Sequence, residues 1–300
     1  MLGGFCLCCV PRALQADAPE RFEEVARGLH VRRGLDVDAA AGNADAIANV
    51  GFIVGGHGVF VTDSGGSLAD GMRVRAAVRA VTDKPITHVL MSHIHPDHIF
   101  GAGAFVADKP EFVGHARLPE SLAARGEFYR LHLNEILGPG QAGPIVQPTL
   151  LVEGTREIDL GGRVLALTAH QPAHTSSDVS VLDRETGTLL PADLLFVGRA
   201  PALDGSLKGW LAELAALSQV KAARAVPGHG PVAVDFASGS GPLVRYLTKL
   251  RDETRAAIAA DTGIEKASET VAASERGAWK LFTEYNPRNV TEAYKELEWE

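Results

Sequence analysis

The stretch MSHIHPDHIFGAGAF (residues 91–105) places three histidines and an aspartate within six positions, directly after an apolar run. His93 and His95 are two residues apart, so in an extended or tightly turned backbone both side chains can point to one side and bind one ion. Asp97 and His98 follow a proline turn and can face a second ion. The segment therefore predicts half of a binuclear metal site.

The sequence before this segment reads as strands and one helix. ITHVLM (86–91) is typical of a buried strand, which puts the histidines at the carboxyl end of that strand. Residues 49–55 and 58–63 predict a β-hairpin. A helix is expected over 67–84, with Ser67 as its N-cap. Its apolar face is expected to comprise Met72, Val74, Val78 and Val81.

Downstream, short apolar strands alternate with helices, which indicates an α/β architecture. A helix is expected around 119–137, and a Gly- and Pro-rich loop at 138–148 is expected at the edge of the active face. Further strands are expected at 149–153, 163–168, 179–183, 187–190 and 223–230, with a helix around Trp210. Residues 28–232 predict one domain and residues 241–300 a helical extension packed on it, with a buried stripe at Leu243, Leu247 and Leu250.

Composition favours a small-molecule substrate. The chain has 300 residues, of which 46% are hydrophobic and 22% charged, as in ordinary globular proteins. Its formal charge is -8, and no run of five basic residues occurs, which argues against a nucleic-acid partner. No stretch reaches the roughly 20 apolar residues that a membrane-spanning helix needs, so no stable membrane insertion is expected.

The amino terminus predicts a signal segment at residues 1–17. Its apolar start and the small residues before a cleavage point after Ala16 resemble an export signal whose basic beginning is missing. The expected location is therefore the periplasm, or the cytoplasm if this segment is not a signal. All three cysteines, Cys6, Cys8 and Cys9, lie in this segment, so any metal in the body of the chain must be held by His, Asp or Glu.

Three later residues complete the predicted metal site: His174, Asp193 and His229. Each follows or interrupts an apolar run, with Pro or Gly nearby, as expected for a ligand at the edge of a sheet. Together with the first segment they make five histidines and two carboxylates. Ligands of this kind without sulfur suit Zn²⁺, with iron or manganese as alternatives.

The order of these residues resembles the metallo-β-lactamase superfamily, in which VFVTDSGG would be an early strand ending in Asp63 and GHG near residue 230 the last ligand loop. A finer resemblance, carried by AIANVGFIVG, AHTSSDVSVLD, GRAPALDGSLKGWL and YNPRN, is to zinc metallohydrolases associated with quinoprotein relay systems. Those are bacterial and typically exported. The chain departs from that pattern at Ala192, where a glycine commonly precedes the aspartate.

The resemblance implies an αββα sandwich and two zinc ions per chain. It implies that His93, His95 and His174 hold the first ion, that Asp97, His98 and His229 hold the second, and that Asp193 bridges both. A hydroxide shared by the two ions would attack an ester, thioester or amide, with Asp97 as the catalytic residue that orients it and carries its proton. The resemblance also implies a link to a periplasmic quinoprotein or cytochrome system.

Other polar residues are interpreted as structural. These are His57 in the hairpin turn, His88 and His170 in strands, His115 in packing, and His132 in a helix. Asp63, Thr175 and Asp178 are interpreted as residues that fix loops. Arg199 and Lys208 are interpreted as facing water rather than an anionic substrate.

Three alternatives remain open from the sequence. The same ligands could hold iron in a redox enzyme similar to a persulfide dioxygenase. The chain could instead be a β-lactamase, although it keeps Asp193 and has no cysteine there. It could also be a metal-binding scaffold without catalysis, although such a protein has no need of an open binuclear site.

Overall fold

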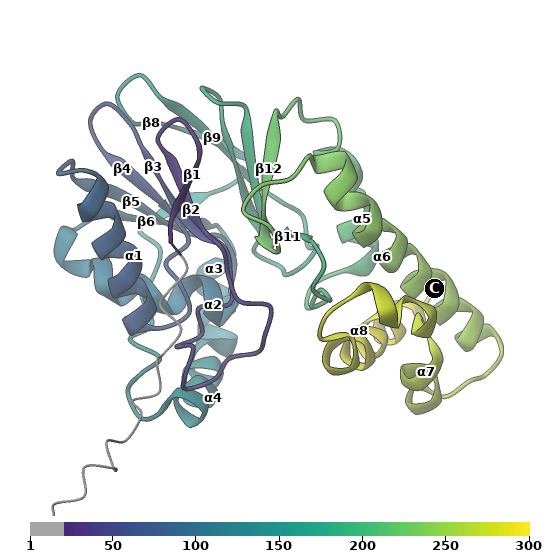
Figure 1. Cartoon of the computed structure of the whole chain (residues 1–300). Helices are drawn as coiled ribbons and strands as arrows, with labels where there is room; N and C mark the ends of the chain where they lie inside the picture. The colour runs from purple at the N-terminus through teal and green to yellow at the C-terminus, as the bar shows by residue number, and fades with distance from the viewer. Residues whose placement is uncertain (1–20) are drawn as a thin grey trace, which may run out of the picture.

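The computed structural model describes residues 21–300, and the predicted signal segment at 1–17 lies outside the described residues. Two sheets face each other, and helices cover the outer side of each one (Figure 1). The expected αββα sandwich is therefore confirmed. None of the helices within residues 21–300 is both long and apolar enough to cross a membrane.

The first sheet has seven strands in chain order. The first four are antiparallel to their neighbours, and the last three continue in parallel, each after a helical crossover or a long connection. The edge strand β1 was not expected from the sequence, whereas β7 at the other edge matches the strand expected at 149–153. The strands are β1 (Glu23–Ala26), β2 (Leu29–Arg32), β3 (Val50–Val54), β4 (Val59–Thr62), β5 (Ile86–Met91), β6 (Glu111–His115) and β7 (Leu150–Val152).

Helices pack on the outer face of this sheet. They are α1 (Leu68–Val81), α2 (Pro96–Ile99), the 3-10 segment η1 (Phe100–Asp108), α3 (Leu118–Ser121), the π-helical turn η2 (Leu122–Gly126) and α4 (Glu127–Leu137). Ser67 caps α1 as expected, because its Oγ accepts from the backbone N–H of Asp70 at 3.2 Å. The expected apolar face of α1 is half wrong. Val74 and Val78 are buried, whereas Met72 and Val81 are 60% and 48% exposed.

The reason lies in helix geometry. Met72 is two residues from Val74, which is a rotation of about 200° around the helix and places it on the opposite face. Val81 belongs to the last turn of α1, which ends at Thr82. The buried apolar face of α1 is therefore narrower than the sequence predicted.

The second sheet has five strands in the order β12-β11-β10-β9-β8. Only β11 and β12 are parallel, and helix α5 (Leu207–Leu217) connects them. Strand β8 was not expected, because its side chains are mostly exposed and show no apolar alternation. The strands are β8 (Thr155–Asp159), β9 (Val164–Ala169), β10 (Val179–Asp183), β11 (Thr188–Phe196) and β12 (Arg224–His229).

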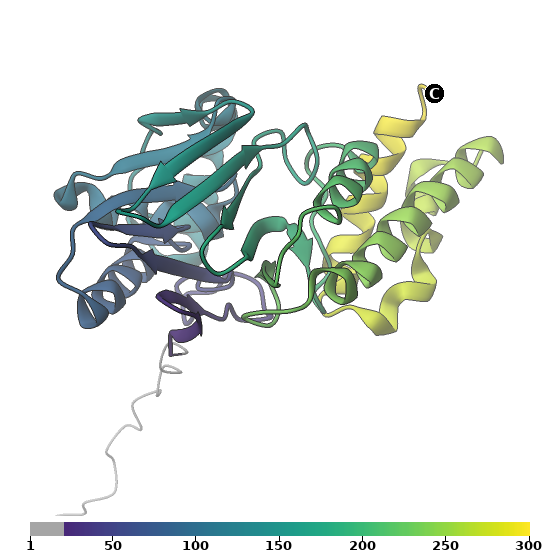
Figure 2. The same cartoon turned by 90° about the horizontal axis from the view of Figure 1, so that it is seen from above.

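The carboxyl-terminal helices lie on the outer side of this second sheet, as Figure 2 shows from above, and the first of them contacts β11. They are α6 (Phe236–Ala259), α7 (Ile264–Thr270), the 3-10 segment η3 (Ala273–Ala278) and α8 (Phe282–Leu297). The predicted stripe on α6 is buried in one hydrophobic cluster with Trp210 of α5 and Leu194 of β11. The helical extension therefore shares its core with the sandwich.

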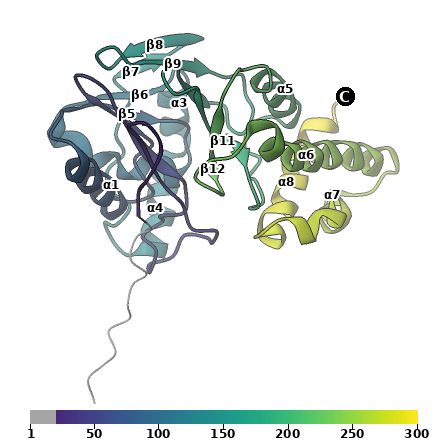
Figure 3. The ribbon, with the colours of Figure 1, turned by 45° about the horizontal axis from the view of Figure 1, so that its top comes forward.

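The strands alternate between two cores. Phe60 of β4 is buried between the two sheets, whereas its neighbours Val59 and Val61 pack under the helices of the first sheet. Such two-sided burial is typical of a central strand. Strands β4 and β5 are parallel, as are β11 and β12, so the carboxyl ends of each pair lie together. The polar residues at these ends meet at one edge of the sandwich. Figure 3 shows β11 and β12 between α4 and α8.

Candidate metal centre

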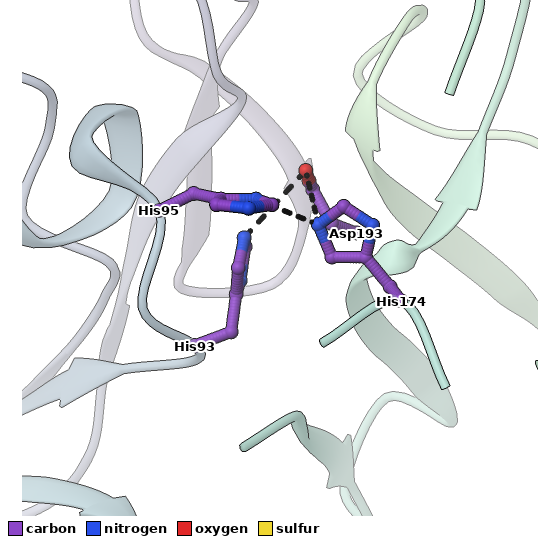
Figure 4. Close-up of side chains that lie close together, drawn as sticks. All are labelled: His93, His95, His174 and Asp193. Carbon is purple, nitrogen blue, oxygen red and sulfur yellow. Dashed lines mark hydrogen bonds and ion pairs between the residues drawn. The ribbon is translucent and has the colours of Figure 1, made fainter. Parts of the chain in front are cut away.

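Seven polar side chains meet at this edge of the sandwich. The first cluster is His93, His95, His174 and Asp193, and the second cluster is Asp97, His98 and His229. Within each cluster the ligand atoms all lie within 4.8 Å of one another. Figure 4 shows the side chains of the first cluster pointing toward a common centre. The structure thus brings together every residue that the sequence singled out as a ligand.

Asp63 fixes the histidine segment from the end of β4. Its backbone has a φ of 64°, and its carboxylate accepts hydrogen bonds from the N–H and Oγ of Ser92, both at 2.8 Å. The same carboxylate lies 2.8 Å from Nδ1 of His98. The interpretation of Asp63 as a residue that fixes the loop is confirmed.

The carboxylate of Asp193 lies between the two clusters. Its Oδ2 is 3.7 Å from Nε2 of His93 and 3.4 Å from Nε2 of His174. Its Oδ2 is also 3.3 Å from Nε2 of His229, and its Oδ1 is 3.1 Å from Nε2 of His98. One carboxylate therefore faces both groups of histidines, which is the geometry that a bridging ligand requires.

Two backbone features hold Asp193 in this place. A Cβ added to Gly228 of the neighbouring strand would lie 1.9 Å from Oδ1 of Asp193, so only glycine leaves room for the carboxylate. Ala192 has a φ of 48°, a conformation that glycine adopts more readily. Residue 192 is therefore a position where the backbone conformation favours glycine, and here it is alanine.

Each histidine also has a partner for the ring nitrogen that faces away from the clusters. Such contacts select the tautomer and the ring orientation of metal-binding histidines. The partners are Ser92 Oγ for His93 (3.0 Å), Asp63 for His98 (2.8 Å), the Ala202 carbonyl for His174 (2.6 Å), the Ile47 carbonyl for His229 (3.0 Å) and Asp204 for His95 (3.3 Å).

Three buried polar atoms facing the clusters find no hydrogen-bond partner among residues 21–300: His93 Nε2, His98 Nε2 and Asp193 Oδ1. An unsatisfied buried polar group costs about 1–3 kcal/mol. Binding of cations by these atoms would remove that cost. Nitrogen and oxygen donors without sulfur are also a suitable set for zinc. The residues present therefore fit a pair of metal ions.

Burial and mutual contacts shift the charges of the site. Burial, followed by the proximity of His98, lowers the pKa of His93 well below its usual value. Burial, followed by His95, lowers the pKa of His174 to about 3. Burial opposes the ionisation of Asp97, but the nearby His98 and His229 together outweigh it and hold the pKa of Asp97 below its usual range. These shifts favour the neutral form of His93 and His174, whereas the nearby carboxylates outweigh burial and raise the pKa of His98 and His229.

A cavity of about 610 Å³ opens onto the centre. The candidate ligands His95, Asp97, Asp193 and His229 line it, together with side chains of α4, α8 and the loop after β11. The loop at 138–148 was expected at this pocket, but none of its residues lines the cavity. Helix α4, which directly precedes that loop, forms this wall of the pocket in its place.

The interpretation of Arg199 as facing water is wrong. Its side chain is 3% exposed and lines the cavity. Nη1 lies 3.1 Å from Nδ1 of His229, and Nη2 donates to the hydroxyl of Tyr285 at 3.0 Å. Helix α8 covers the arginine, a contact over 86 residues that no local pattern shows. Lys208 is about half exposed, as expected, and pairs with Glu300.

The remaining histidines do not join either cluster. His57 lies in the hairpin turn, His88 is half-buried beside Thr87, and His132 of α4 lies at the pocket rim. His115 is buried, with its Nε2 3.2 Å from the carbonyl of His170. His170 lies 2.7 Å from both Glu213 and Ser180, which ties α5 to the second sheet.

Thr175 and Asp178 fix the loop of His174, as expected. The carboxylate of Asp178 accepts from the N–H of Thr175 at 2.9 Å and from its Oγ1 at 2.7 Å. Sequence reasoning missed two polar residues of the site, Asp204 and Asn49. Asn49 donates from Nδ2 to the carbonyl of Pro227 at 2.8 Å and so holds the last ligand loop. Neither residue lies in a recognisable metal-binding spacing.

A family model described as the metallo-beta-lactamase superfamily matches residues 44–229. A linear primary-alkylsulfatase of Pseudomonas sp. (strain ATCC 19151) is 37% identical over 62 residues, which are 21% of this chain and only 12% of that relative's length. Similar solved structures include a metallo-beta-lactamase from Pontibacter korlensis, with a TM-score of 0.62 and 16% identity over 76% of this chain and 98% of the other. Another is the stereoselective inverting sec-alkylsulfatase Pisa1 from Pseudomonas sp., with a TM-score of 0.70 and 16% identity over 91% of this chain and 49% of the other.

Proposed function

The chain belongs to the metallo-beta-lactamase superfamily, and from that membership we propose that it is a metal-dependent hydrolase that holds one zinc ion in each cluster. The observation that carries the proposal is the Asp193 carboxylate, which lies between two sets of histidines at the base of a cavity. The unpartnered ring nitrogens of His93 and His98 support it further.

Two zinc ions bound there would acidify a water molecule near neutral pH and would polarise the bond under attack. Asp97 is placed to orient that water, because its carboxylate lines the cavity and its Oδ2 lies 3.2 Å from Nε2 of His229. Its carboxylate is charged near neutral pH, so an oxygen is available to accept the proton of the water and pass it to the leaving group. Asp97 is the proposed catalytic residue.

The proposed substrate is a small molecule with an ester, thioester or amide bond. A volume of about 610 Å³ is within the usual range for small-molecule pockets, about 300–1,000 Å³. Leu133 and Ile136 of α4 and Phe196 of β11 give it an apolar wall beside the polar centre. A substrate with an apolar group beside its scissile bond fits this cavity, because the apolar group can lie against this wall while the bond faces the polar centre.

Sulfate esters are a second candidate class. The local identity of 37% with an alkylsulfatase supports it. The similarity to Pisa1 also extends over 91% of this chain, beyond the 76% matched by the lactamase from Pontibacter korlensis. At 16% identity these structures carry the fold alone, so the sulfate ester enters as a class to be tested beside the acyl substrates.

The test is metal analysis of the purified protein followed by turnover of ester, thioester, amide, lactam and alkyl sulfate substrates. We expect zinc bound at two ions per chain, turnover of at least one class, loss of turnover with chelator, and recovery on adding zinc. Full zinc loading without hydrolysis of any class would contradict the proposal. Iron in place of zinc, with oxygen consumption on a sulfur substrate, would favour the redox alternative.

Asp97→Asn separates catalysis from binding of the metal. The amide keeps an oxygen donor but cannot accept a proton, so we expect turnover to fall by about 10²–10⁴-fold while zinc remains bound. A variant that retains full turnover would remove Asp97 from the catalytic role.

Export and the link to a quinoprotein system stand on the sequence resemblance and remain predictions. If the chain is exported, the mature protein in the periplasmic fraction begins after Ala16. Mass spectrometry of the intact protein from fractionated cells decides this. An uncleaved chain confined to the cytoplasm would contradict it.

A further inference from the structure

His95 differs from the other histidines of the two clusters in the ring nitrogen that faces its cluster. The Nδ1 of His95 lies 2.9 Å from Nε2 of His174, inside the first cluster. The other four histidines present Nε2 to the Asp193 carboxylate. To bind a metal, His95 must therefore keep a free electron pair on Nδ1 and carry its proton on Nε2.

Asp204 is the acceptor for the proton on Nε2 of His95. Its Oδ2 lies 3.3 Å from Nε2 of His95. It lies in the loop between β11 and α5, and its backbone N–H donates to the carbonyl of His174 at 2.9 Å. One residue thus touches one ligand of the first cluster and anchors the loop that carries another.

Two further groups reach the same oxygen from the opposite wall of the pocket. Arg125 donates from Nη1 to Oδ2 of Asp204, and the hydroxyl of Tyr129 lies 3.3 Å from that atom. Arg125 belongs to the π-helical turn η2, and Tyr129 lies one turn further in α4. π-helical turns are rare and frequently occur at functional sites. This one directs Arg125 toward Asp204, beside the cavity.

We propose that Asp204, held by Arg125 and Tyr129, is a positioning residue that keeps Nδ1 of His95 directed into the first cluster. Metal binding in that cluster then depends on contacts from both walls of the pocket. The inference rests on the proposed function, because it assigns a role toward the metal ions that the two clusters would hold.

The test replaces Asp204 in the full-length protein and measures zinc affinity by competition with a chelator. In Asp204→Ala we expect one of the two zinc ions to bind about 10–100-fold more weakly, while the other keeps its affinity. Asp204→Asn keeps an acceptor for Nε2 of His95, so it should recover part of the loss. Arg125→Met should cause a smaller loss, because Asp204 then keeps its contact with His95 but loses its own support.

Glu157→Gln is the matched control, since it removes an exposed carboxylate whose partner Arg184 lies on the surface of the second sheet. It should leave both affinities unchanged. Parental affinity for both ions in Asp204→Ala would overturn the inference. So would an equal weakening of both ions together with lower stability of the metal-free protein, because that result describes a general structural residue. A parent chain that binds no zinc would overturn the proposed function itself.

Discussion

Gly228 shows how a single missing side chain shapes the centre. The absence of a Cβ lets the Asp193 carboxylate lie between the two clusters, with its Oδ1 in the space that a methyl group would occupy. The strand pairing of β11 with β12 brings the two residues together. At the scale of the residue, the metal site therefore depends on space as well as on ligand chemistry.

Gly228→Ala should displace the Asp193 carboxylate, because the added Cβ would lie 1.9 Å from its Oδ1. We expect weaker binding of both zinc ions and a loss of turnover of about a hundredfold, the order of effect of a misplacement near 1 Å. Zinc content after dialysis and turnover measure the two effects. Gly241→Ala is the control, since a Cβ there meets nothing within 4 Å. Equal zinc content in both variants would contradict this account.

Asp178 should make stability depend on pH. Burial raises its pKa to about 6, against the hydrogen bonds from Thr175, so the folded chain favours the protonated form. The unfolded chain titrates near pH 4. Stability from this group is therefore fully present below about pH 4 and falls as the pH rises to about 6, by at most about 3 kcal/mol.

Asp178→Asn isolates that contribution, because the amide stays neutral at every pH. We expect the free energy of unfolding of the metal-free variant, relative to the parent, to rise between pH 4 and pH 6 and then to level off. Urea unfolding at several pH values measures it. A difference that does not change with pH would show that folding leaves the pKa of Asp178 unchanged.

At the scale of the element, buried ion pairs connect helices and strands that are distant in sequence. Arg32 of β2 and Asp70 of α1 are almost fully buried and form a bidentate pair. Asp70 also accepts a hydrogen bond from the N–H of Gly66, just before α1. The pair therefore fixes the start of α1 against β2 of the first sheet.

Arg32→Met should lower the free energy of unfolding by about 3–5 kcal/mol, because it leaves the carboxylate of Asp70 buried without its partner. Urea unfolding measures the loss. Arg184→Met is the control, because its pair with Glu157 is half exposed and contributes at most about 1 kcal/mol. Similar losses in the two variants would contradict the argument.

At the scale of the whole molecule, the helical extension is part of the sandwich. Leu243 and Tyr246 of α6 are fully buried in the same cluster as Trp210 and Leu194. Helix α8 also supplies Tyr285, which contacts Arg199 at the wall of the cavity. The extension thus completes both the outer core and the pocket.

A chain that lacks residues 236–300 should not fold cooperatively, because the outer face of the second sheet would lose its apolar cover. We expect a poorly soluble product, or one without a near-UV circular dichroism signal. Thermal unfolding of the truncated chain is the measurement. A sharp transition with retained zinc binding would show that residues 28–232 form an independent domain, as their boundaries in the sequence allow.

The sequence by itself determined the class of fold and which residues are candidate ligands. His93, His95, Asp97 and His98 are close together in the chain, and apolar runs before them indicate strand ends, so local chemistry and periodicity are sufficient. The central strands and the carboxyl-terminal helices were predictable for the same reason. Strand β8 was not, because its exposed side chains carry no apolar pattern.

Only the tertiary structure decided how the ligands are held. The contacts of Arg199 with Tyr285, of Asp204 with His95 and of Asn49 with Pro227 join residues 86, 109 and 178 positions apart. Such contacts depend on how the two sheets and the outer helices pack together. A local pattern records the type of a side chain, whereas its partner, its exposure and the ring nitrogen that it presents are set by segments that are distant in sequence.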